Sequence, residues 1–335
     1  MAEFVSSFIT GFQSVVEADL ALRLKNLKIL NLFDGLVHYR FDGDSRELEK
    51  IIYFNNTFFV LKTMKGKNLN FPAIINSVCS AKNYFLVNKG SFRVRFQNEN
   101  QFTKVDKNLT RRAEDYVLQN SKLKLDRLSP TNEVWFSIRR EGFAFCGELI
   151  SKREFTEKNL NKGELRPEIA YLICCFAQVK PEDTILEPFC GYGSIPVQLA
   201  KKFRFEMLYV SDLDKERASF TAARKQLSAP NILCRAANAL ELSHIQDKSV
   251  SLVITDPPWG YYEDLPDIEG FYKQMFASFD RVLKEGGRGV ILSARKEELE
   301  RAVAETGFKI KNSLQTLVNG KKAGVYYIER AERAQ

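Results

Sequence analysis

The sequence predicts an α/β protein in which a doubly wound, mostly parallel sheet in the C-terminal half follows a smaller α+β part. From residue 166 onward, short apolar runs alternate with helical stretches, and strands separated by helices of this length form parallel sheets. Between residues 3 and 64 the order of the expected elements is strand, helix, strand, strand, helix, strand. That order is typical of a ferredoxin-like unit.

The first expected domain covers residues 1–66 and is organised around a hairpin. Asp34-Gly35 separates two strand-like runs and is a strong hairpin signal. The expected strands are 3–9, 27–33, 36–41 and 57–64, and the expected helices are 11–24 and 45–53.

A second α+β domain is expected over residues 67–151, followed by a polar linker at 152–165. Alternation from Phe92 to Phe96 places Arg93 and Arg95 on one face of a strand. The expected helices are 72–84 and 109–119, and the expected strands are 91–96, 133–140 and 143–150, with a turn at Glu141-Gly142.

The remaining domain, residues 166–335, opens with a helix that has Pro167 in its first turn, where a missing amide hydrogen costs nothing. Its expected strands are 184–189, 207–212, 231–238, 251–256 and 288–294, its helices are 167–177, 195–203, 215–227, 269–283 and 296–306, and a hairpin-like pair ends the chain. Ligands on such sheets bind beyond the carboxyl ends of the strands.

Length and composition limit the class of protein. A chain of 335 residues with 44% apolar and 27% charged residues predicts a soluble protein of two or three domains. Apolar runs near 20 residues and a basic-flanked leader are both missing from the sequence, so we expect an intracellular, cytoplasmic protein without a membrane span. Six cysteines without CxxC spacing and two histidines predict no metal site.

The positive charge is concentrated in the first half of the chain. Residues 1–164 carry 26 Lys and Arg against 19 Asp and Glu, whereas residues 165–335 carry 24 against 23. A basic half beside a neutral half indicates a polyanion partner, although ordinary solvated surface is an equal alternative. The candidate residues for contacting such a polyanion are Arg93, Arg95, Arg139, Arg140, Lys152 and Arg153.

The first motif is EPFCGYGSI, residues 187–195, between a strand and a helix. Gly191 and Gly193 permit a tight turn and a close ligand, and the helix amides that follow can meet a carboxylate. About twenty residues later, Asp212 ends the next strand, where a carboxylate can accept hydrogen bonds from ribose hydroxyls. Asp214 is the alternative, and either aspartate could instead cap a helix. Asn238 could pair with an adenine edge or form a turn.

The second motif is DPPW, residues 256–259, directly after an apolar strand. The Asp256 carboxylate and the Pro257 carbonyl can both accept hydrogens from one exocyclic amine, Pro258 stiffens the turn, and Trp259 offers a stacking face. Two fixed acceptors favour the pyramidal nitrogen that attacks an electrophilic methyl group, so orientation and electrostatics are the main catalytic contributions.

These stretches resemble known enzyme motifs. EPFCGYGSI is similar to the first motif, D-P-F-C-G-S-G-T-I, of Rossmann-like S-adenosylmethionine-dependent methyltransferases, and DPPW resembles their amino-methylation motif. The whole chain resembles the THUMP-containing RNA guanine-N(2) methyltransferases, in the stretches GFQSVVEADL, DGLVHYRFDG, EVWFSIRREGFAFCGELISKR and GELRPEIA.

The resemblance implies a ferredoxin-like domain (1–66), a THUMP RNA-binding domain (67–151), a linker (152–165) and a methyltransferase domain (166–335). It implies that S-adenosyl-L-methionine binds Glu187, Phe189, Gly191, Gly193, Asp212, Asn238 and Asp256, and that Asp256, Pro257, Pro258 and Trp259 hold the target amine. The sequence departs from the family at Glu187, Tyr192 and Asn238, where aspartate, a small residue and aspartate are common. Tyr192 is expected to crowd the cofactor loop.

The leading hypothesis is therefore methylation of the 2-amino group of a guanosine in tRNA or another structured RNA. N(6)-adenine methylation of RNA or DNA is the alternative reaction. An RNA-binding protein whose catalytic domain is inactive, or needs an activating protein subunit, is the alternative from another class.

Overall fold

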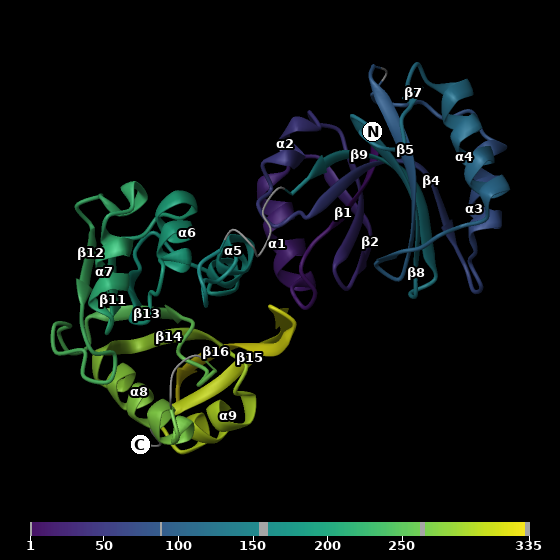
Figure 1. Cartoon of the computed structure of the whole chain (residues 1–335). Helices are drawn as coiled ribbons and strands as arrows, with labels where there is room; N and C mark the ends of the chain where they lie inside the picture. The colour runs from purple at the N-terminus through teal and green to yellow at the C-terminus, as the bar shows by residue number, and fades with distance from the viewer. Residues whose placement is uncertain (1, 88, 154–159, 262–264, 332–335) are drawn as a thin grey trace. The chain divides into compact units, whose positions relative to one another are not determined.

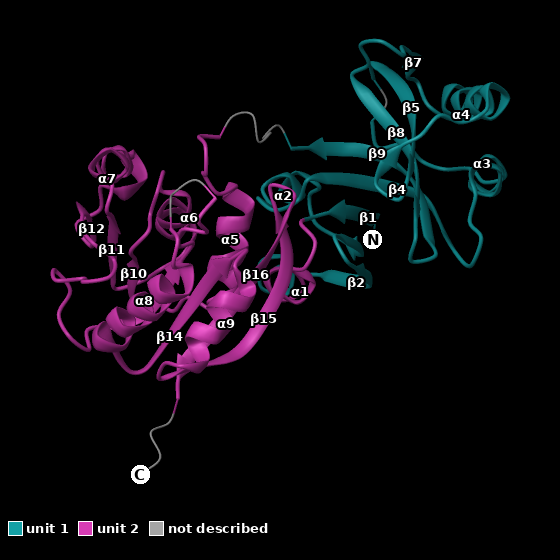
Figure 2. Ribbon diagram, turned by 60° about the horizontal axis from the view of Figure 1, so that its bottom comes forward, with its two compact units in different colours: residues 1–8, 20–154 teal, residues 9–19, 155–335 magenta. Residues whose placement is uncertain are grey.

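The computed structural model describes residues 2–87, 89–153, 160–261 and 265–331. They fall into two compact units (Figure 2), one formed by Met1–Phe8 with Leu20–Glu154 and the other by Ile9–Asp19 with Phe155–Gln335. Residues 154–159 of the predicted linker lie outside the described residues. In the ranges that are described, none of the helices is long and apolar enough to cross a membrane.

The first unit is built on one continuous sheet with the strand order β2-β3-β1-β4-β9-β8-β5-β6, and β7 pairs with β5. The strands are β1 (Ala2–Ser7), β2 (Leu27–Phe33), β3 (Leu36–Phe41), β4 (Asn56–Lys65), β5 (Ser91–Asn98), β6 (Gln101–Phe102), β7 (Lys124–Leu125), β8 (Asn132–Arg139) and β9 (Phe143–Lys152). Helix α1 (Gln13–Arg23) has residues in both units. The other helices of the first unit are α2 (Arg46–Glu49), α3 (Phe71–Cys79) and α4 (Lys107–Asn120).

The first four strands pair antiparallel in the order β2-β3-β1-β4, as a ferredoxin-like unit requires. The predicted hairpin at Asp34-Gly35 is confirmed, because Gly35 has φ +76° and Phe33 pairs with Leu36. The sheet continues from β4 into β9 without interruption. The predicted boundary at residue 66 thus follows β4 inside one sheet, and the division into two domains stays a prediction.

Helices α3 and α4 lie together on one face of the β4–β9–β8–β5 part of this sheet (Figure 1). Asn70 begins α3 by accepting a hydrogen bond from the amide of Ala73 at 2.9 Å, and Asp106 caps α4 in the same way. Their apolar faces bury against the sheet, as fully buried Ile75 and Phe92 show.

Three predicted helices are shorter than expected. After Glu49, residues 50–54 continue as single turns with amide-to-carbonyl bonds three residues back, such as Ile51 to Leu48. Helix α3 ends at Cys79, where the Ser80 hydroxyl donates to the Ser77 carbonyl. The predicted helix 215–227 ends at Ala222, and a 3₁₀ turn buries Leu227 instead. Periodicity alone did not predict these endings, because buried residues continue past them.

The second unit contains a seven-stranded sheet with the order β12-β11-β10-β13-β14-β16-β15. All neighbours are parallel up to β14, and the final hairpin is antiparallel. The strands are β10 (Thr184–Glu187), β11 (Met207–Asp212), β12 (Ile232–Ala236), β13 (Val250–Thr255), β14 (Leu283–Ser293), β15 (Phe308–Val318) and β16 (Lys321–Arg330), and the helices are α5 (Pro167–Phe176), α6 (Ser194–Lys202), α7 (Lys215–Ala222), α8 (Ile268–Val282) and α9 (Lys296–Ala304).

Helices cover both faces of this sheet, with α5 and α6 on one side and α8 and α9 on the other (Figure 1). The predicted fold class, a doubly wound and mostly parallel sheet preceded by an α+β part, is confirmed. The central strands are buried on both faces, which explains why β13 reads as an unbroken apolar run.

A buried ion pair fixes the end of the sheet at which strands β10 and β13 begin. Arg288 of β14 donates to both carboxylate oxygens of Asp183, at 3.0 and 2.7 Å, and Ser251 of β13 donates to the same carboxylate at 2.7 Å. These bonds hold together the starts of β10 and β13 and thereby set the register of the strands that carry the site.

Residues 9–19 belong to the second compact unit although the sequence places them in the first predicted domain. The Asp19 carboxylate accepts from the Tyr171 hydroxyl at 2.6 Å, and the Thr10 carbonyl accepts from the Thr316 hydroxyl at 2.8 Å. Gly11 has φ +90°, and a Cβ there would lie 1.8 Å from the Gln315 carbonyl oxygen. Only glycine permits this approach.

Candidate active site

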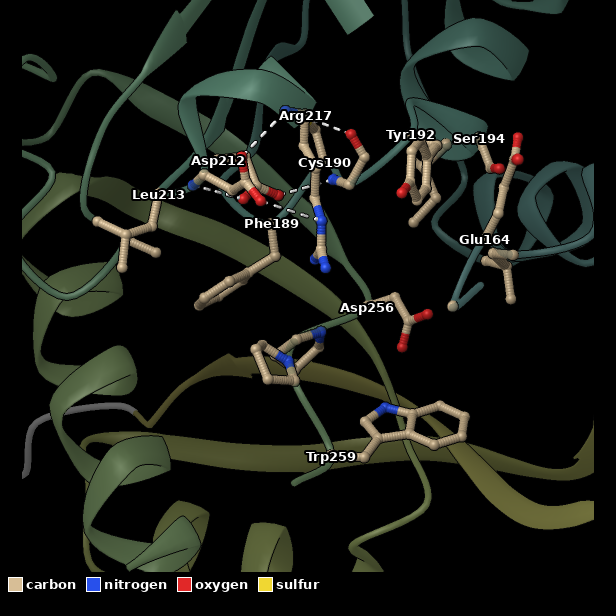
Figure 3. A pocket seen from close by; sticks show the side chains of 18 of the residues that line it. Glu164, Phe189, Cys190, Tyr192, Ser194, Asp212, Leu213, Arg217, Asp256 and Trp259 are labelled. Atoms are coloured by element: carbon tan, nitrogen blue, oxygen red, sulfur yellow. Dashed lines mark hydrogen bonds and ion pairs between the residues drawn. The ribbon is translucent and has the colours of Figure 1, made fainter. Parts of the chain in front are cut away.

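The residues expected from the two motifs gather at the carboxyl ends of neighbouring strands. β10 lies between β11 and β13, where the strand order reverses, and doubly wound sheets bind ligands in the crevice at such a point. A cavity of about 830 Å³ opens there, a volume typical of small-molecule sites. Its lining includes Glu187, Phe189, Gly191, Asp212, Asn238, Asp256, Pro257, Pro258 and Trp259 (Figure 3).

The two glycines of the first motif have different reasons to be glycine. Both adopt left-handed φ values, +49° at Gly191 and +84° at Gly193. A Cβ at Gly193 would lie 2.9 Å from the Thr221 side chain, whereas one at Gly191 would meet no described protein atom within 4 Å. Gly191 lines the cavity. Gly193 instead allows α6 to pack closely on α7, and its contact with the cofactor stays a prediction.

Asp212 and Asp214, the two candidates after β11, have separate roles. Asp214 caps α7 by accepting hydrogen bonds from the amides of Glu216 and Arg217, at 2.8 and 3.2 Å. The Asp212 carboxylate accepts from the amide of Gly191 at 2.8 Å and lines the cavity. Asp212 therefore ties the glycine turn to the end of β11 and is the better placed of the two for a ribose.

Glu187 is a fully buried acid at the end of β10. Its Oε1 accepts hydrogen bonds from the Phe189 amide at 3.0 Å and the Thr255 hydroxyl at 2.7 Å, so it joins β10 to β13. Oε2 is buried, and no donor or acceptor in the described ranges reaches it. Burial, reinforced by the nearby carboxylates of Asp256 and Asp212, raises the pKa of Glu187 well above its ordinary value. Burial therefore favours the protonated form of Glu187.

Asn238 adopts the turn role that the sequence left open. Its Oδ1 accepts from the Leu240 amide at 3.0 Å and its Nδ2 donates to Glu241 at 2.8 Å. The side chain also lines the cavity. Contact of Asn238 with an adenine stays a prediction. It requires that the side chain bind the adenine while it keeps its hydrogen bonds to Leu240 and Glu241.

The DPPW loop is fixed by hydrogen bonds to its carbonyl groups. The hydroxyl of buried Tyr272 in α8 donates to the Pro258 carbonyl at 3.1 Å, and the Arg295 Nε donates to the Trp259 carbonyl at 2.8 Å. Asp256 and Trp259 lie on the same wall of the cavity (Figure 3). The loop thus presents a carboxylate and an indole ring from a backbone held by two side chains distant in sequence.

The indole of Trp259 carries an unused donor. Its Nε1 atom is buried, and the described residues provide it with no acceptor. Leaving a buried N–H unpaired costs about 1–3 kcal/mol. A ligand with an acceptor next to the Trp259 ring would recover this energy.

Tyr192 does not crowd the glycine turn in the way its size predicted. Its ring lies edge-to-face with Phe220 of α7, with 5.5 Å between centroids, and the Arg217 guanidinium lies 5.8 Å from its centroid. The ring lines the cavity. Tyr192 therefore forms a side wall together with α7 (Figure 3).

Several cavity residues had no place in the sequence hypothesis. Leu213 is 72% exposed yet lines the cavity, and an apolar residue between two aspartates after a strand was its signal. Glu164 anchors the segment 162–165 at the cavity by accepting from Asn161 at 2.8 Å and from Arg224 at 3.2 Å. Other lining residues that were missed are Arg217, Tyr261, Phe271 and Lys321.

The candidate RNA-contacting residues lie in the first unit and differ in how exposed their side chains are and in the protein groups that they bind. Arg93 and Arg95 both bond to the carboxylate of Glu133, whose pKa burial would raise but hydrogen bonds from Arg93 and Trp135 lower below its ordinary value. Arg140 is 72% exposed, and Lys152 is exposed. Arg153 is partly buried, and its amide donates to the Asn55 carbonyl at 2.8 Å.

Arg139 is almost fully buried, so a structural role competes with its predicted role as an RNA contact. Its side chain is 6% exposed. The guanidinium donates to the Asp34 carbonyl at 2.7 Å and to the Asn100 side chain, and it pairs with Glu141 at 3.2 Å. These bonds join the β2–β3 turn to the end of β8.

Among the residues that the structure describes, no group of three or more His, Cys, Asp or Glu side chains is arranged to hold a metal ion. The six cysteines are free thiols. Burial raises the pKa of Cys190, which lies in the glycine turn, above its ordinary value.

The chain is similar to known methyltransferases in sequence and fold. Residues 153–323 match the family model described as UPF0020, RMKL-like, methyltransferase domain. A tRNA (guanine(6)-N2)-methyltransferase from Thermus thermophilus is 25% identical over 251 residues, which cover 72% of this chain and 73% of that protein. Two solved structures cover nearly the whole chain.

The structure of TrmN from Thermus thermophilus has a TM-score of 0.78 and 21% identity, covering 98% of this chain and all of that one. The structure of SMU.472 complexed with SAH has a TM-score of 0.72 and 13% identity, covering all of this chain and 99% of that one. At these identities the two structures show the shared fold.

Proposed function

We propose that this protein, which belongs to the UPF0020 family of RMKL-like methyltransferase domains, transfers a methyl group from S-adenosyl-L-methionine to the 2-amino group of a guanosine in tRNA. One observation carries the proposal. The DPPW loop after β13 and the glycine turn after β10 line the same cavity, so an amine acceptor site and a cofactor site adjoin each other. The tRNA guanine specificity follows the name of the Thermus relative.

The cavity fits the proposed cofactor. Asp212 offers a carboxylate for ribose hydroxyls, and Leu213 and Asn238 beside it offer an apolar and a polar contact for the adenine. The first amides of α6 offer donors for a carboxylate. When bound, S-adenosylmethionine supplies an electrophilic methyl group. The carboxylates of Asp212 and Asp256 give this cavity a negative side that suits a cation.

The DPPW residues orient the target amine. We assign the Asp256 carboxylate and the Pro257 carbonyl as acceptors for its two hydrogens, and the Trp259 ring as the surface on which the base stacks. Tyr272 and Arg295 position the loop through its carbonyl groups. With both N–H bonds directed at acceptors, the nitrogen lone pair is free to attack the methyl group.

The proton balance needs no strong base. As the new nitrogen–carbon bond forms, the bond between the methyl carbon and the cofactor sulfur would break, and its electron pair would stay on the sulfur to give S-adenosylhomocysteine. The amine nitrogen would gain the positive charge, and its remaining protons would become acidic. One proton then passes to Asp256 or through it to water, which restores a neutral methylated amine. Burial raises the pKa of Glu187 and favours its protonated form, which limits the negative charge beside Asp256.

We propose that the first unit holds the RNA, with residues 1–66 as the ferredoxin-like domain and residues 67–151 as the THUMP domain. The basic excess of the first half supports this. Arg140 and Lys152 are its most exposed candidate contacts. We also propose a cytoplasmic location, where tRNA substrates are found.

The experiment is incubation of the purified chain with methyl-labelled S-adenosylmethionine and unmodified tRNA, followed by nucleoside mass spectrometry. We expect label on the 2-amino group of guanosine, and position 6 is the first to map because the Thermus relative is named for it. Label on the 6-amino group of adenosine would replace guanine with adenine. Absence of label, restored by a cell extract, would indicate a required partner subunit, and absence in both would indicate an RNA-binding role.

Substitutions of Trp259 test the assigned loop within this assay. Trp259→Ala removes a stacking surface worth about 1–3 kcal/mol per base and is expected to lower kcat/KM for tRNA roughly 5- to 150-fold. Trp259→Phe keeps an aromatic face and is expected to retain most of the activity. Equal turnover of all three proteins would dismiss the stacking role.

A further inference from the structure

Two large apolar side chains are exposed in the loop between α3 and β5. Tyr84 is 71% exposed and Leu86 is 37% exposed, whereas Phe85 between them is 4% exposed. The Tyr84 ring lies beside the Phe59 ring of β4, with 6.5 Å between the centroids and an interplanar angle of 83°. We name residues 81–87 the Tyr84 loop.

A buried acid holds the Tyr84 loop from its inner side. Glu148 of β9 is fully buried, and its two carboxylate oxygens accept hydrogen bonds from the amides of Leu86 and Val87, at 2.7 and 3.0 Å. Burying a carboxylate is costly unless hydrogen bonds compensate, and these two bonds come from the backbone of the loop. Phe85 packs into the core between the sheet and helices α3 and α4. The second half of the loop is therefore fixed in position.

Helix α4 fixes the first half of the Tyr84 loop. The Tyr116 hydroxyl donates to the Ala81 carbonyl at 2.8 Å and accepts from the Asn83 side-chain amide at 2.6 Å. Tyr116 is itself 6% exposed. The loop is thus bonded to both α4 and β9, and Tyr84 is presented by a backbone that is already ordered. A contact that is ordered in advance loses less entropy when a ligand binds.

The surroundings of the Tyr84 loop are basic. Lys82 and Lys89 are exposed, and residues 80–91 include no acidic residue. Neither lysine forms an ion pair with any residue that the structure describes. In the neighbouring strand β9, exposed Lys152 lies four residues beyond Glu148. Positive charge without nearby carboxylates favours an anionic ligand at this surface.

We propose that the Tyr84 loop binds an unpaired nucleotide of the RNA, whose base stacks on the Tyr84 ring while Lys82 and Lys89 contact phosphates. This inference rests on the proposed function, in which the first unit holds the RNA. Bases inside a helix are covered by their neighbours, whereas an unpaired base can place one face on an exposed aromatic ring. A protein partner could also cover an exposed ring, but the two lysines favour a polyanion.

Two hairpin RNAs with the same stem test the stacking contact. One is blunt-ended, and the other has a short unpaired extension that contains a fluorescent adenine analogue. We expect the full chain to bind the extended hairpin more tightly. Tyr84→Leu keeps an apolar side chain without an aromatic face and should bind the extended hairpin roughly 5- to 150-fold more weakly, the equivalent of about 1–3 kcal/mol per stacked base. Tyr84→Phe should bind it like the wild type, and all three proteins should bind the blunt hairpin equally.

The fluorescence of the adenine analogue reports the stacking itself. Its intensity should fall when the extended hairpin binds the wild type or Tyr84→Phe, and it should fall much less with Tyr84→Leu. Phe102→Leu is the matched control, because Phe102 is 55% exposed and pairs with Gln97 near the other end of β5. It should change neither affinity nor fluorescence. Urea midpoints of the Tyr84 variants should match the wild type, because Tyr84 is exposed.

Salt dependence tests the lysines. Lys82→Gln should reduce the slope of log affinity against log salt for the extended hairpin by about 0.7, the value of one phosphate on a single strand. Lys67→Gln is the control, because Lys67 is exposed, likewise has no ion pair within the described ranges, and follows the other end of β4. Equal slopes for both variants and the wild type would mean that Lys82 contacts no phosphate.

A Tyr84→Leu protein that binds the extended hairpin like the wild type, with the same fall in fluorescence, would overturn the inference and leave the loop to a protein partner. Failure of the proposed function would look different. The wild type would then transfer no label to guanosine, while its preference for the extended hairpin would remain measurable, because binding needs no transfer. If the wild type methylates guanosine in tRNA but binds both hairpins equally, the reaction stands and the inference is wrong.

Discussion

In the second unit Asp212 and Asp256 line an open cavity, whereas in the first unit Arg93 and Arg95 share the carboxylate of Glu133. The sequence predicts both pairs as functional residues from their residue types and their positions in strands. The carboxylates lie at the ends of parallel strands, where topology alone places them beside a crevice. The arginines lie in the middle of strand β5, where a partner on the neighbouring strand β8 decides how much of their charge faces solvent.

The difference shows that a motif tied to a strand end predicts a location better than a count of charges does. Six basic residues were candidates for RNA, and in the structure Arg139 is buried while Arg93 and Arg95 are each 26% exposed. The excess charge of the first half remains, but it belongs to other side chains as well, such as Arg111 at 81% exposure.

The largest effect is expected at Asp256. Asp256→Ala removes an acceptor for the target amine and should lower kcat roughly 100- to 1,000-fold, the scale of losing one preorganised electrostatic group. Binding of S-adenosylmethionine, followed by calorimetry, should stay within a few-fold of the wild type. Asp247→Ala is the control, because Asp247 is 66% exposed and lies outside the described cavity lining. Loss of cofactor binding in Asp256→Ala would place the residue in the cofactor site instead.

Sequence patterns predicted the strands of the second unit well because each is a short apolar run that ends in a turn. They located Asp212 and Asp256 for the same reason. They could not find Tyr272, Arg295 or Lys321, which contact residues 258–261 from 14 to 60 residues further along the chain. Nor could they show that Glu187 is fully buried, because that depends on the packing of β10 between two other strands.

In the first unit, the next largest effect is expected at Arg139. Arg139→Ala leaves the Asp34 carbonyl and the Asn100 side chain without their donor and should lower the free energy of unfolding by about 2–3 kcal/mol. Arg140→Ala should change it by less than about 0.5 kcal/mol, as exposed substitutions do. Urea denaturation measures both.

RNA binding should show the reverse order for this pair. At a temperature where both variants are folded, Arg140→Ala is expected to weaken RNA binding and Arg139→Ala to leave it unchanged. A stable Arg139→Ala protein with impaired RNA binding would restore Arg139 to the RNA surface.

In the cavity, Glu187→Gln should change how stability depends on pH. Glu187 has a raised pKa in the folded protein. Its contribution to the free energy of unfolding is therefore fully present below the ordinary carboxyl pKa of about 4.3, and it is lost as the pH rises toward the pKa of the folded protein. Over that window the free energy of unfolding of the wild type should fall by up to about 1.4 kcal/mol per pH unit from this group. Glu187→Gln cannot ionise and should show a flatter profile.

The matched control for this profile is Glu182→Gln, because Glu182 is exposed. Denaturation midpoints between pH 4.5 and 8 would separate the two variants. If Glu187→Gln follows the wild-type slope, Glu187 is ionised in the folded protein and adds negative charge beside Asp256.

The smallest effect is expected at Arg95. This substitution tests most directly whether the arginines of β5, unlike the carboxylates at the strand ends, are held back by a protein partner. Glu133 accepts from Arg93 Nε at 2.9 Å and from Arg95 Nε at 3.1 Å, and the Phe102 ring lies 4.5 Å from the Arg95 guanidinium carbon. Because one carboxylate already neutralises half of this pair, Arg95→Gln should weaken RNA binding by less than about 1 kcal/mol, roughly fivefold. Arg111→Gln, which removes a more exposed charge, is the companion variant. A loss above tenfold in Arg95→Gln, with a salt slope reduced by about one, would mean that Arg95 contacts phosphate despite Glu133, and that the alternating strand had predicted its role correctly.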